Sequence, residues 1–359
     1  MEVDYIIVGF GLAGMSFAHV LEKKGKSFVV FEDGSQHSSR VAGGMYNPVI
    51  LRRFTPVWNA ASQLEKALPF YRELEEKLSQ TYDYPLDIYR VLHSVEEQNN
   101  WYAAADRPAL SPYMIPRIIH KPLPGIRAGF GFGKLSRTGR VAVPKLIRDY
   151  RAYLENKTGF FAEKFVHTAL EFKEERVQYN HINAGKVVFC EGFGLLQNPF
   201  FKQLPLPGSK GEVLTIHAPG LQLESLVKSA VFILPLGNDY YKVGATFHRT
   251  DKTDTPTEAA REELLQKLRI FMTHPFKVVD QAAGVRPTVA DRRPLVGKHP
   301  QIQQLAILNG LGTRGVMIAP ETAEQLYDHL ETGKPLLPSI SINRFQARWP
   351  PRDRSVQTG

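Results

Sequence analysis

Three glycines near the start of the chain have the spacing of a nucleotide-binding turn, in the run Gly9-Phe10-Gly11-Leu12-Ala13-Gly14. In that spacing the first glycine permits a tight turn, the second lets the backbone approach a pyrophosphate, and the third lets a helix pack closely on a strand. Glu32 follows at roughly the 20 residues at which an acid accepts hydrogen bonds from ribose hydroxyls. An acid there disfavours a 2′-phosphate, so the pattern predicts a site for FAD or NAD rather than NADP. The alternative is a glycine-rich turn that binds nothing.

The elements around these residues form the unit that the motif requires. Residues 3–8 are apolar and partly β-branched, as in a buried parallel strand. A helical pattern runs from Leu12 to Lys24, and Gly25 is placed to end it. Residues 27–31 form a second apolar strand that leads into Glu32. This is a βαβ unit, so the sequence predicts an α/β fold that begins with a Rossmann-type domain.

Further elements follow along the chain. A hairpin is predicted around the turn Gly237-Asn238-Asp239, which joins apolar runs at 231–236 and 240–247. Between Pro85 and Pro144 the prolines, aromatic residues and short strand-like runs predict a different layer or domain. The remaining predictions are strands at 88–95, 186–190 and 305–308 and helices at 64–78, 144–154, 256–272 and 318–330.

Composition narrows the class of protein. The chain has 359 residues, of which 43% are hydrophobic and 23% charged, values that exclude a disordered chain and a coiled coil. The length predicts two domains. The net charge of +9 favours anionic partners without selecting one. The single cysteine, Cys190, excludes an intramolecular disulfide and a cysteine-based zinc site. Since no apolar run is long enough for a spanning helix, we expect a cytoplasmic protein that does not bind a membrane.

Five segments, in order along nearly the whole chain, resemble the D-amino-acid oxidase and glycine oxidase superfamily of FAD-dependent oxidoreductases. They are residues 8–14 with Glu32; SSRVAGGMYNP at 38–48; VVFCEG at 187–192; AGVRP at 283–287 with Asp291 and PLVG at 294–297; and NGLGTRGVMIAP at 309–320. The middle region, roughly 80–140, matches poorly. The resemblance implies FAD as the cofactor and no metal. The family's covalent branch uses a cysteine in the C-terminal part of the chain, which this sequence lacks, so we expect noncovalent FAD.

The resemblance also implies an architecture and a set of cofactor contacts. We expect a Rossmann-type FAD-binding domain of residues 1–75, 140–200 and 280–359. Residues 76–139 and 201–279 would form an α+β substrate-binding domain with a large mixed or antiparallel sheet. By resemblance, residues 38–45 lie along the flavin, Val166 meets the adenine, and the loop and helix N-terminus at 312–316 face the flavin O2. The expected cofactor-binding residues are Gly9, Gly11, Leu12, Ala13, Gly14, Glu32, Asp33, Ser38, Ser39, Gly43, Gly44, Met45, Val166, Cys190, Glu191, Gly192, Arg286, Gly310, Gly312, Thr313, Arg314, Gly315 and Val316.

Arg286 matches the arginine that holds the substrate carboxylate in this family, and a guanidinium suits a carboxylate because it binds both oxygens. The family's substrate-facing tyrosine corresponds here to Phe232, so Tyr240 and Tyr241 are candidates to compensate for the missing hydroxyl. His248, after the second hairpin strand, is a further catalytic candidate. The reaction implied is oxidation of the C–N bond of an amino acid or N-substituted glycine by hydride transfer to flavin N5, followed by imine hydrolysis.

Two other functions remain open. Residues 312–315 also look like the flavin domain of the tRNA wobble-uridine maturation enzyme, which removes a carboxymethyl group from an aminomethyl uridine. The positive charge and the basic tail, with Arg344, Arg348, Arg352 and Arg354, suit tRNA. A non-catalytic flavin-binding protein, or an NAD-linked dehydrogenase, is the third reading. The expected partners are a small carboxylated amine and dioxygen or another electron acceptor, with tRNA less favoured.

Overall fold

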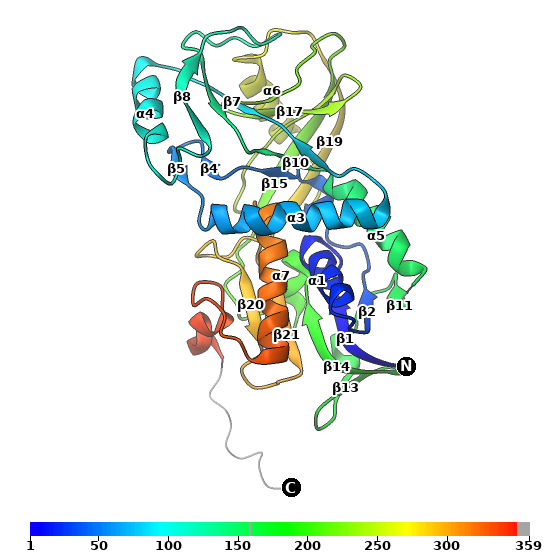
Figure 1. The fold of residues 1–359 in the computed structure, drawn as a ribbon. Coiled ribbons are helices and arrows are strands. Elements are labelled where there is room, and N and C mark those ends of the chain that lie inside the picture. Colours follow the sequence, from blue (N-terminus) through cyan, green and yellow to red (C-terminus); the bar gives the residue numbers. More distant parts are fainter. Residues whose placement is uncertain (158, 350–359) are drawn as a thin grey trace. The chain divides into compact units, whose positions relative to one another are not determined.

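A computed structural model describes residues 1–157 and 159–349, and these form two compact units (Figure 1). The first contains residues 1–39, 146–208 and the segment from Arg286 onward, and the second contains residues 40–145 and 209–285. The sequence assigned residues 40–75 to the cofactor domain, whereas the structure places them in the second unit. The reason is main-chain pairing: β3 (Met45–Tyr46) pairs with β10 (Gly139–Val141), and β10 also pairs with β6 (Asp83–Pro85).

The first unit contains one eight-stranded sheet and the helices α1 and α7. Its strands run in the order β11-β2-β1-β14-β13-β12, and β21 pairs with both β14 and β20. Strands β11, β2, β1, β14 and β21 run parallel to one another, whereas β13 and β20 pair antiparallel with β14 and β21. The elements are β1 (Glu2–Val8), α1 (Leu12–Lys23), β2 (Phe28–Phe31), β11 (Gly159–Phe161), β12 (Leu170–Phe172), β13 (Val177–Tyr179), β14 (Ile182–Phe189), β20 (Leu295–Lys298), β21 (Leu305–Asn309) and α7 (Gly315–Thr332). The short helices are η1 (His167–Ala169), η2 (Gly192–Gln197) and η3 (Ile342–Arg348).

The parallel strands of the first unit end at one edge of the sheet. Val8 lies beside Phe31 on one side and beside Phe189 on the other, and Phe189 lies beside Ile307. The loops that follow β1, β2, β14 and β21 therefore leave from the same edge. In doubly wound sheets ligands bind at the carboxyl ends of the strands, so this edge is where the predicted turn must act.

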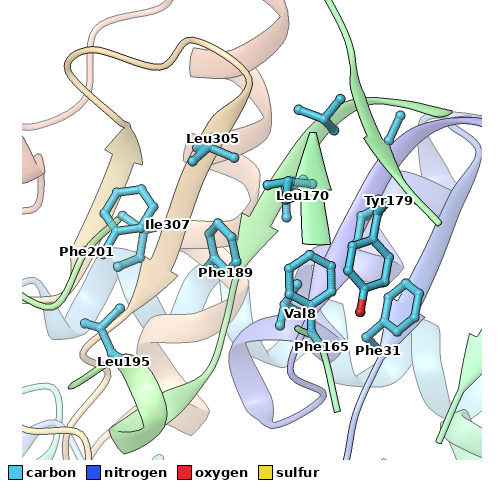
Figure 2. Close-up of a cluster of buried hydrophobic side chains, with 14 of the residues drawn as sticks. Val8, Phe31, Phe165, Leu170, Tyr179, Phe189, Leu195, Phe201, Leu305 and Ile307 are labelled. Carbon is cyan, nitrogen blue, oxygen red and sulfur yellow. The ribbon is translucent and has the colours of Figure 1, made fainter. Parts of the chain in front are cut away.

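Aromatic and aliphatic side chains fill one face of that sheet (Figure 2). The rings of Phe165 and Tyr179 stack at 4.1 Å, and Phe31 packs edge-on against Tyr179. Val8, Phe189 and Ile307 come from three adjacent strands and are all buried in this cluster. Their near-continuous apolar character is the pattern of strands covered on both faces, which is why the sequence identified them.

The second unit is built on a different eight-stranded sheet, in the order β19-β15-β18-β17-β16-β7-β9-β8. The predicted hairpin is present as β17 and β18, and α6 covers one face of the sheet over a core that includes Val227, Ile233 and Leu268. The strands are β7 (Ile88–Val91), β8 (Met114–Ile119), β9 (Phe132–Leu135), β15 (Ser209–His217), β16 (Leu226–Lys228), β17 (Phe232–Gly237), β18 (Tyr240–Gly244) and β19 (Lys277–Arg286). The helices are α3 (Ala60–Leu78), α4 (Val95–Ala105) and α6 (Glu258–Arg269), and β4 (Val49–Ile50) pairs with β5 (Thr55–Pro56). Two helices, α2 (Ser38–Val41) and α5 (Val143–Glu155), cross the boundary between the units.

Helix α4 was missed by the sequence analysis, which extended a strand from 88 to 95. The strand ends at Val91, and Ser94 caps a helix by accepting a hydrogen bond from the N–H of Glu97 at 3.1 Å. A serine followed three residues later by a glutamate is a sequence pattern typical of helix N-termini, so this helix could have been predicted. The helix is positioned by Trp101, whose fully buried ring occupies the space above Gly133 and whose Nε1 donates to the Ile115 carbonyl at 2.9 Å.

Within the described residues, no helix is long and apolar enough to cross a membrane. Of the basic tail on which part of the tRNA reading rests, Arg344 forms an ion pair with Asp291 at 2.7 Å, whereas Arg352 and Arg354 lie outside the described residues.

An ion-pair network joins the C-terminal end of α7 to β1. Glu331 accepts a hydrogen bond from the Tyr5 hydroxyl at 2.5 Å and forms ion pairs with Lys26 and Lys186. Burial by itself raises the pKa of Glu331, but the bonds from Lys26 and Tyr5 and the charge of Lys186 outweigh it and lower the pKa to about 2. Because the folded pKa lies below the unfolded value, this stabilisation is present above about pH 4.5 and is lost as the pH falls towards 2.

We therefore expect Glu331→Gln to lower the free energy of unfolding at pH 7 by about 2 kcal/mol. The difference from the wild type should shrink below pH 4.5, because the wild-type carboxylate is then protonated on unfolding. Urea titrations between pH 7 and pH 3.5 measure both effects. The matched control is Glu171→Gln, which removes an exposed carboxylate paired with Lys173 in the same unit and should change stability little. A constant difference across the pH range would contradict the role of the charge.

Candidate functional site

The turn after β1 is a place where only glycine fits. Gly9 has φ +94°, and a Cβ there would lie 2.6 Å from the Cys190 carbonyl oxygen. A Cβ on Gly14 would lie 1.9 Å from the Gly9 carbonyl oxygen. The main chain of α1 therefore packs directly on the turn, and the turn packs on the end of β14. This close packing is what the glycine spacing predicted.

Glu32 holds the end of β2 against that turn. Its buried carboxylate accepts hydrogen bonds from the N–H of Phe10 at 2.5 Å and from the N–H of Gly34 at 2.8 Å. A carboxylate has about four acceptor positions, so two remain for ligand hydroxyls. The next residue, Asp33, is exposed and accepts from the N–H of Ser35 at 2.9 Å, which shapes the following turn.

Two helix N-termini meet at this edge of the first unit. The first turn of α1 is bounded by Ser39, whose hydroxyl accepts from the N–H of Leu12 at 3.2 Å and would lie 3.1 Å from a Cβ on Gly11. Helix α7 begins at Gly315, where a Cβ would lie 3.0 Å from the Leu12 side chain. Aligned peptide dipoles make each N-terminus partly positive, so the pair attracts a negatively charged group.

The loop before α7 adds positive charge to the same edge. Gly310 and Gly312 have positive φ, and a Cβ on Gly310 would lie 2.4 Å from the Val289 side chain. Arg314 is the N-cap residue of α7, and its carbonyl accepts the N–H of Met317, so the helix starts before the predicted residue 318. Burial, followed by the nearby charge of Arg292, lowers the pKa of Arg314. Two neighbouring guanidinium groups favour an anionic ligand here.

Side-chain amides that the sequence analysis did not select hold the third loop of this edge. The amide of Asn309 donates to the Gly192 carbonyl at 2.9 Å and accepts from the N–H of Gly310 at 2.7 Å. Glu191 is fixed by His167 at 2.8 Å and by the amide of Asn198 at 2.7 Å. The signal for Asn309 was its place at the start of a glycine loop directly after a strand.

Two expected cofactor residues have their polar groups engaged within the protein. The Val166 N–H donates to the Tyr179 hydroxyl, and its carbonyl accepts from the N–H of Ala169, both at 2.9 Å. An adenine contact at Val166 remains a prediction, for which the exposed side chain and the second lone pair of that carbonyl are available. Cys190 is buried directly after β14, and burial and the neighbouring Glu191 charge raise the pKa of its thiol. An inert thiol here agrees with noncovalent attachment of a cofactor.

In the second unit the expected flavin loop lies on the strand that was expected to face the substrate. A Cβ on Gly43 would meet Leu234 of β17 at 3.3 Å, and a Cβ on Gly44 (φ +68°) would lie 1.9 Å from the Val141 carbonyl oxygen. The structure thus brings together two segments that are nearly 200 residues apart in the chain. Lys242 of β18 fastens this loop by donating to the Val41 carbonyl at 3.1 Å, and the sequence analysis did not identify it.

Arg286 is the last residue of β19, where the chain passes from the second unit to the first. Its carbonyl accepts the N–H of Thr288 at 2.8 Å, which turns the chain directly after it. The guanidinium is half-buried, and burial lowers its pKa. A guanidinium partly removed from water gains from an anionic partner, as a carboxylate site requires.

The other catalytic candidates are placed differently. Tyr241 is buried in the core beneath α6, where its hydroxyl accepts from the N–H of Leu223, and this corrects the expectation that its ring faces the substrate. Strand alternation is the reason, because Tyr241 follows Val243 to the core face and Lys242 points to the other. Tyr240 is 40% exposed and stacks on His217 at 4.7 Å. His248 is half-buried and lies beside Glu263, at 3.6 Å.

Together these residues fit FAD. The crowded glycine turn admits a close approach, the two helix N-termini suit a diphosphate, and Glu32 retains acceptors for ribose hydroxyls.

Comparisons with known proteins agree. The sequence profile described as FAD dependent oxidoreductase matches residues 4–329. A glycine oxidase from Bacillus subtilis is 23% identical, over 96% of this chain and 98% of its own length. A "tRNA 5-methylaminomethyl-2-thiouridine biosynthesis bifunctional protein MnmC" from Idiomarina loihiensis is also 23% identical over 96% of this chain, which spans 59% of that protein.

Among solved structures, iminodiacetate oxidase from Chelativorans sp. BNC1 has the same fold, with a TM-score of 0.77 at 18% identity over 95% of this chain and 98% of that one. The expected combination of a Rossmann-type domain with large mixed sheets is confirmed by this fold and by the pairing described above. FAD is the cofactor, held noncovalently, and the protein is an enzyme. The match over most of the sequence shows that this chain belongs to the FAD dependent oxidoreductase family.

Proposed function

We propose that this enzyme oxidises the C–N bond of a small amine that carries a carboxylate, either an amino acid or an N-substituted glycine. The observation that carries the proposal is Arg286, a half-buried guanidinium at the end of β19. The names of similar proteins support the same substrate class, since they include glycine oxidases and an iminodiacetate oxidase. The imine that forms is hydrolysed by water after release.

In this proposal the chain binds and orients, and the cofactor supplies the redox chemistry. When bound, FAD accepts a hydride from the carbon next to the nitrogen and passes the electrons to dioxygen or another acceptor. Arg286 binds both oxygens of the substrate carboxylate, which restricts the rotation of the carbon that reacts. The N-terminus of α7 with Arg314 stabilises negative charge that develops on its ligand.

The residues of the second unit that surround the expected substrate strand set a limit on the substrate. Phe232 is buried, and its ring lies against Gly244, where a Cβ would be 3.0 Å from it. A phenyl ring offers shape and no hydrogen bond, so any further polar recognition must come from its neighbours. Tyr240 stays a candidate only as an exposed residue at the start of β18, and His248 only as a half-buried residue four positions after that strand ends.

A second candidate function is oxidation of a modified uridine in tRNA. The similarity to the bifunctional tRNA-modifying protein spans 96% of this chain, and the net charge is +9. A carboxymethylaminomethyl uridine carries the same N–CH2–carboxylate group, so Arg286 could hold it in the same way. Free amines and tRNA are therefore compared in one experiment.

The test is an absorbance spectrum of the purified protein and an anaerobic titration with amino acids and N-methylglycines. Loss of the ~450 nm flavin band on adding one of them is the expected result. A band that only tRNA bleaches would support the second candidate, and a band that neither bleaches would indicate a non-catalytic flavoprotein.

Replacing Arg286 tests the carboxylate site. Arg286→Ala should keep the flavin spectrum but lower kcat/KM for the amine about 100-fold, since two charged hydrogen bonds to substrate are lost. Arg286→Lys should recover part of the loss. The control is Arg269→Ala, an exposed arginine at the end of α6. Unchanged kinetics in Arg286→Ala would remove this residue from the mechanism.

Replacing Gly14 tests the cofactor turn. Gly14→Ala forces α1 away from the turn, so we expect a lower flavin-to-protein ratio and a loss of stability of about 2–4 kcal/mol. Gly129→Ala is the control, because nothing lies within 4 Å of its added Cβ. Flavin content from absorbance and thermal unfolding measure the two effects. Wild-type flavin content in Gly14→Ala would show that the turn does not position the cofactor.

A further inference from the structure

Three adjacent strands of the second unit place two cations next to Phe232. Lys228 of β16 lies opposite Arg90 of β7 on one side and opposite Phe232 of β17 on the other. Residues that lie opposite each other in a sheet point to the same face. Their neighbours Val91 and Val227 point to the other face and are buried beneath α6. Arg90, Lys228 and Phe232 therefore form a row on the face that also carries Lys242 and the loop of Gly43.

The acids of this region are already paired with other cations. Arg90 donates to Glu97 of α4 at 3.1 Å, and Lys267 of α6 pairs with Glu263 at 2.5 Å. A third acid, Asp87, pairs with Lys134 at 2.7 Å. The one polar partner that the structure gives Lys228 is the Ala230 carbonyl at 3.4 Å. In the described part of the chain, the charge of Lys228 thus has no carboxylate partner.

The surroundings of Lys228 destabilise its charged form. Lys228 is half-buried, and burial, followed by the charges of Arg90 and Lys267, lowers its pKa to about 8. His93, which follows β7, contacts the Ser229 hydroxyl at 3.1 Å, and neither side chain carries a negative charge. A half-buried ammonium group near two other cations gains from an anionic ligand.

We propose that Lys228, with Arg90 behind it, binds a second acidic group of the substrate, so that the preferred substrate is an amine that carries two carboxylates. This inference rests on the proposed function and on the expectation that Phe232 faces the substrate. The missing tyrosine hydroxyl at Phe232 leaves Lys228 as the adjacent group able to form a polar contact. Lys228 is a binding residue here and takes no part in hydride transfer.

The first test compares substrates with one and two carboxylates on the FAD-loaded enzyme. Lys228→Met should lower kcat/KM for iminodiacetate about 30-fold and for N-methylglycine less than about 3-fold, as expected for loss of one charged hydrogen bond. Lys228→Arg should retain the preference. Lys134→Met, which removes a surface lysine from a neighbouring strand, is the control. An equal effect of Lys228→Met on both substrates would overturn the proposal.

The pH dependence of the substrate preference is a second, independent test of the proposal. Lys228 is protonated below about pH 8, so the preference for iminodiacetate over N-methylglycine should fall as the pH rises through that value. The two substrate amines differ in their own pKa, so the same ratio measured in Lys228→Met supplies the baseline. The fall near pH 8 should be present in the wild type and absent from Lys228→Met. A pH-independent ratio in the wild type would contradict the assignment.

A binding test does not need turnover. Glutarate has two carboxylates and no amine, and butyrate has one. Glutarate should shift the flavin spectrum of the wild type at a concentration about tenfold lower than butyrate does, and Lys228→Met should abolish this difference. If no amine is oxidised but glutarate still binds through Lys228, the proposed reaction fails and the anion site stands. If amines are oxidised but glutarate shows no such preference, the anion site fails.

The midpoint of thermal unfolding of Lys228→Met tests whether Lys228 serves to stabilise the fold instead. A lysine that stabilises the fold would leave Lys228→Met less stable, whereas removal of a half-buried charge without a partner should leave the midpoint unchanged or raise it. A midpoint lowered by several degrees, together with an unchanged substrate preference, would assign Lys228 to the fold instead.

Discussion

The close packing of main chain on main chain at the end of β1 is the constraint on which the cofactor edge depends. Gly14 presses on the Gly9 carbonyl, and Gly9 presses on the Cys190 carbonyl, with no room for a Cβ at either glycine. This contact fixes where α1 begins. Because Gly315 packs against Leu12, it also fixes the N-terminus of α7. Two helix N-termini therefore reach one sheet edge through contacts that side chains would prevent.

The positive charge at this edge of the first unit's sheet follows from that arrangement. The helix N-termini, with Arg314 and Arg292, make the edge positive, while Glu32 is held by two backbone N–H groups. A ligand with a negative diphosphate and ribose hydroxyls meets both requirements, which is the chemistry of FAD. The loops at this edge are joined to one another, because the side chain of Asn309 links the loop after β21 to the loop after β14 by hydrogen bonds.

The two faces of the eight-stranded sheet in the second unit carry different kinds of side chain. Consecutive residues Tyr241 and Lys242 point to opposite faces, the tyrosine into the core under α6 and the lysine to the Val41 carbonyl. The same alternation separates Val227 from Lys228. An apolar face is needed to hold α6, so the polar side chains of these strands collect on the opposite face. Cations gathered in this way cost stability unless a ligand neutralises them.

Local patterns in the sequence determined the βαβ unit, the glycine turn with Glu32, the β17–β18 hairpin and helix α6, because each depends on residues close together in the chain. Helix α4 was equally local, at Ser94 and Glu97, and was missed because the surrounding prolines and aromatic residues suggested strands. Tertiary structure alone decided that residues 40–75 pack with the second unit and that Tyr241 points inward. It alone placed Lys228 between Arg90 and Phe232. Strand order and register pair residues that are distant in the chain, and those pairings set both the face that a side chain occupies and the charges that it meets.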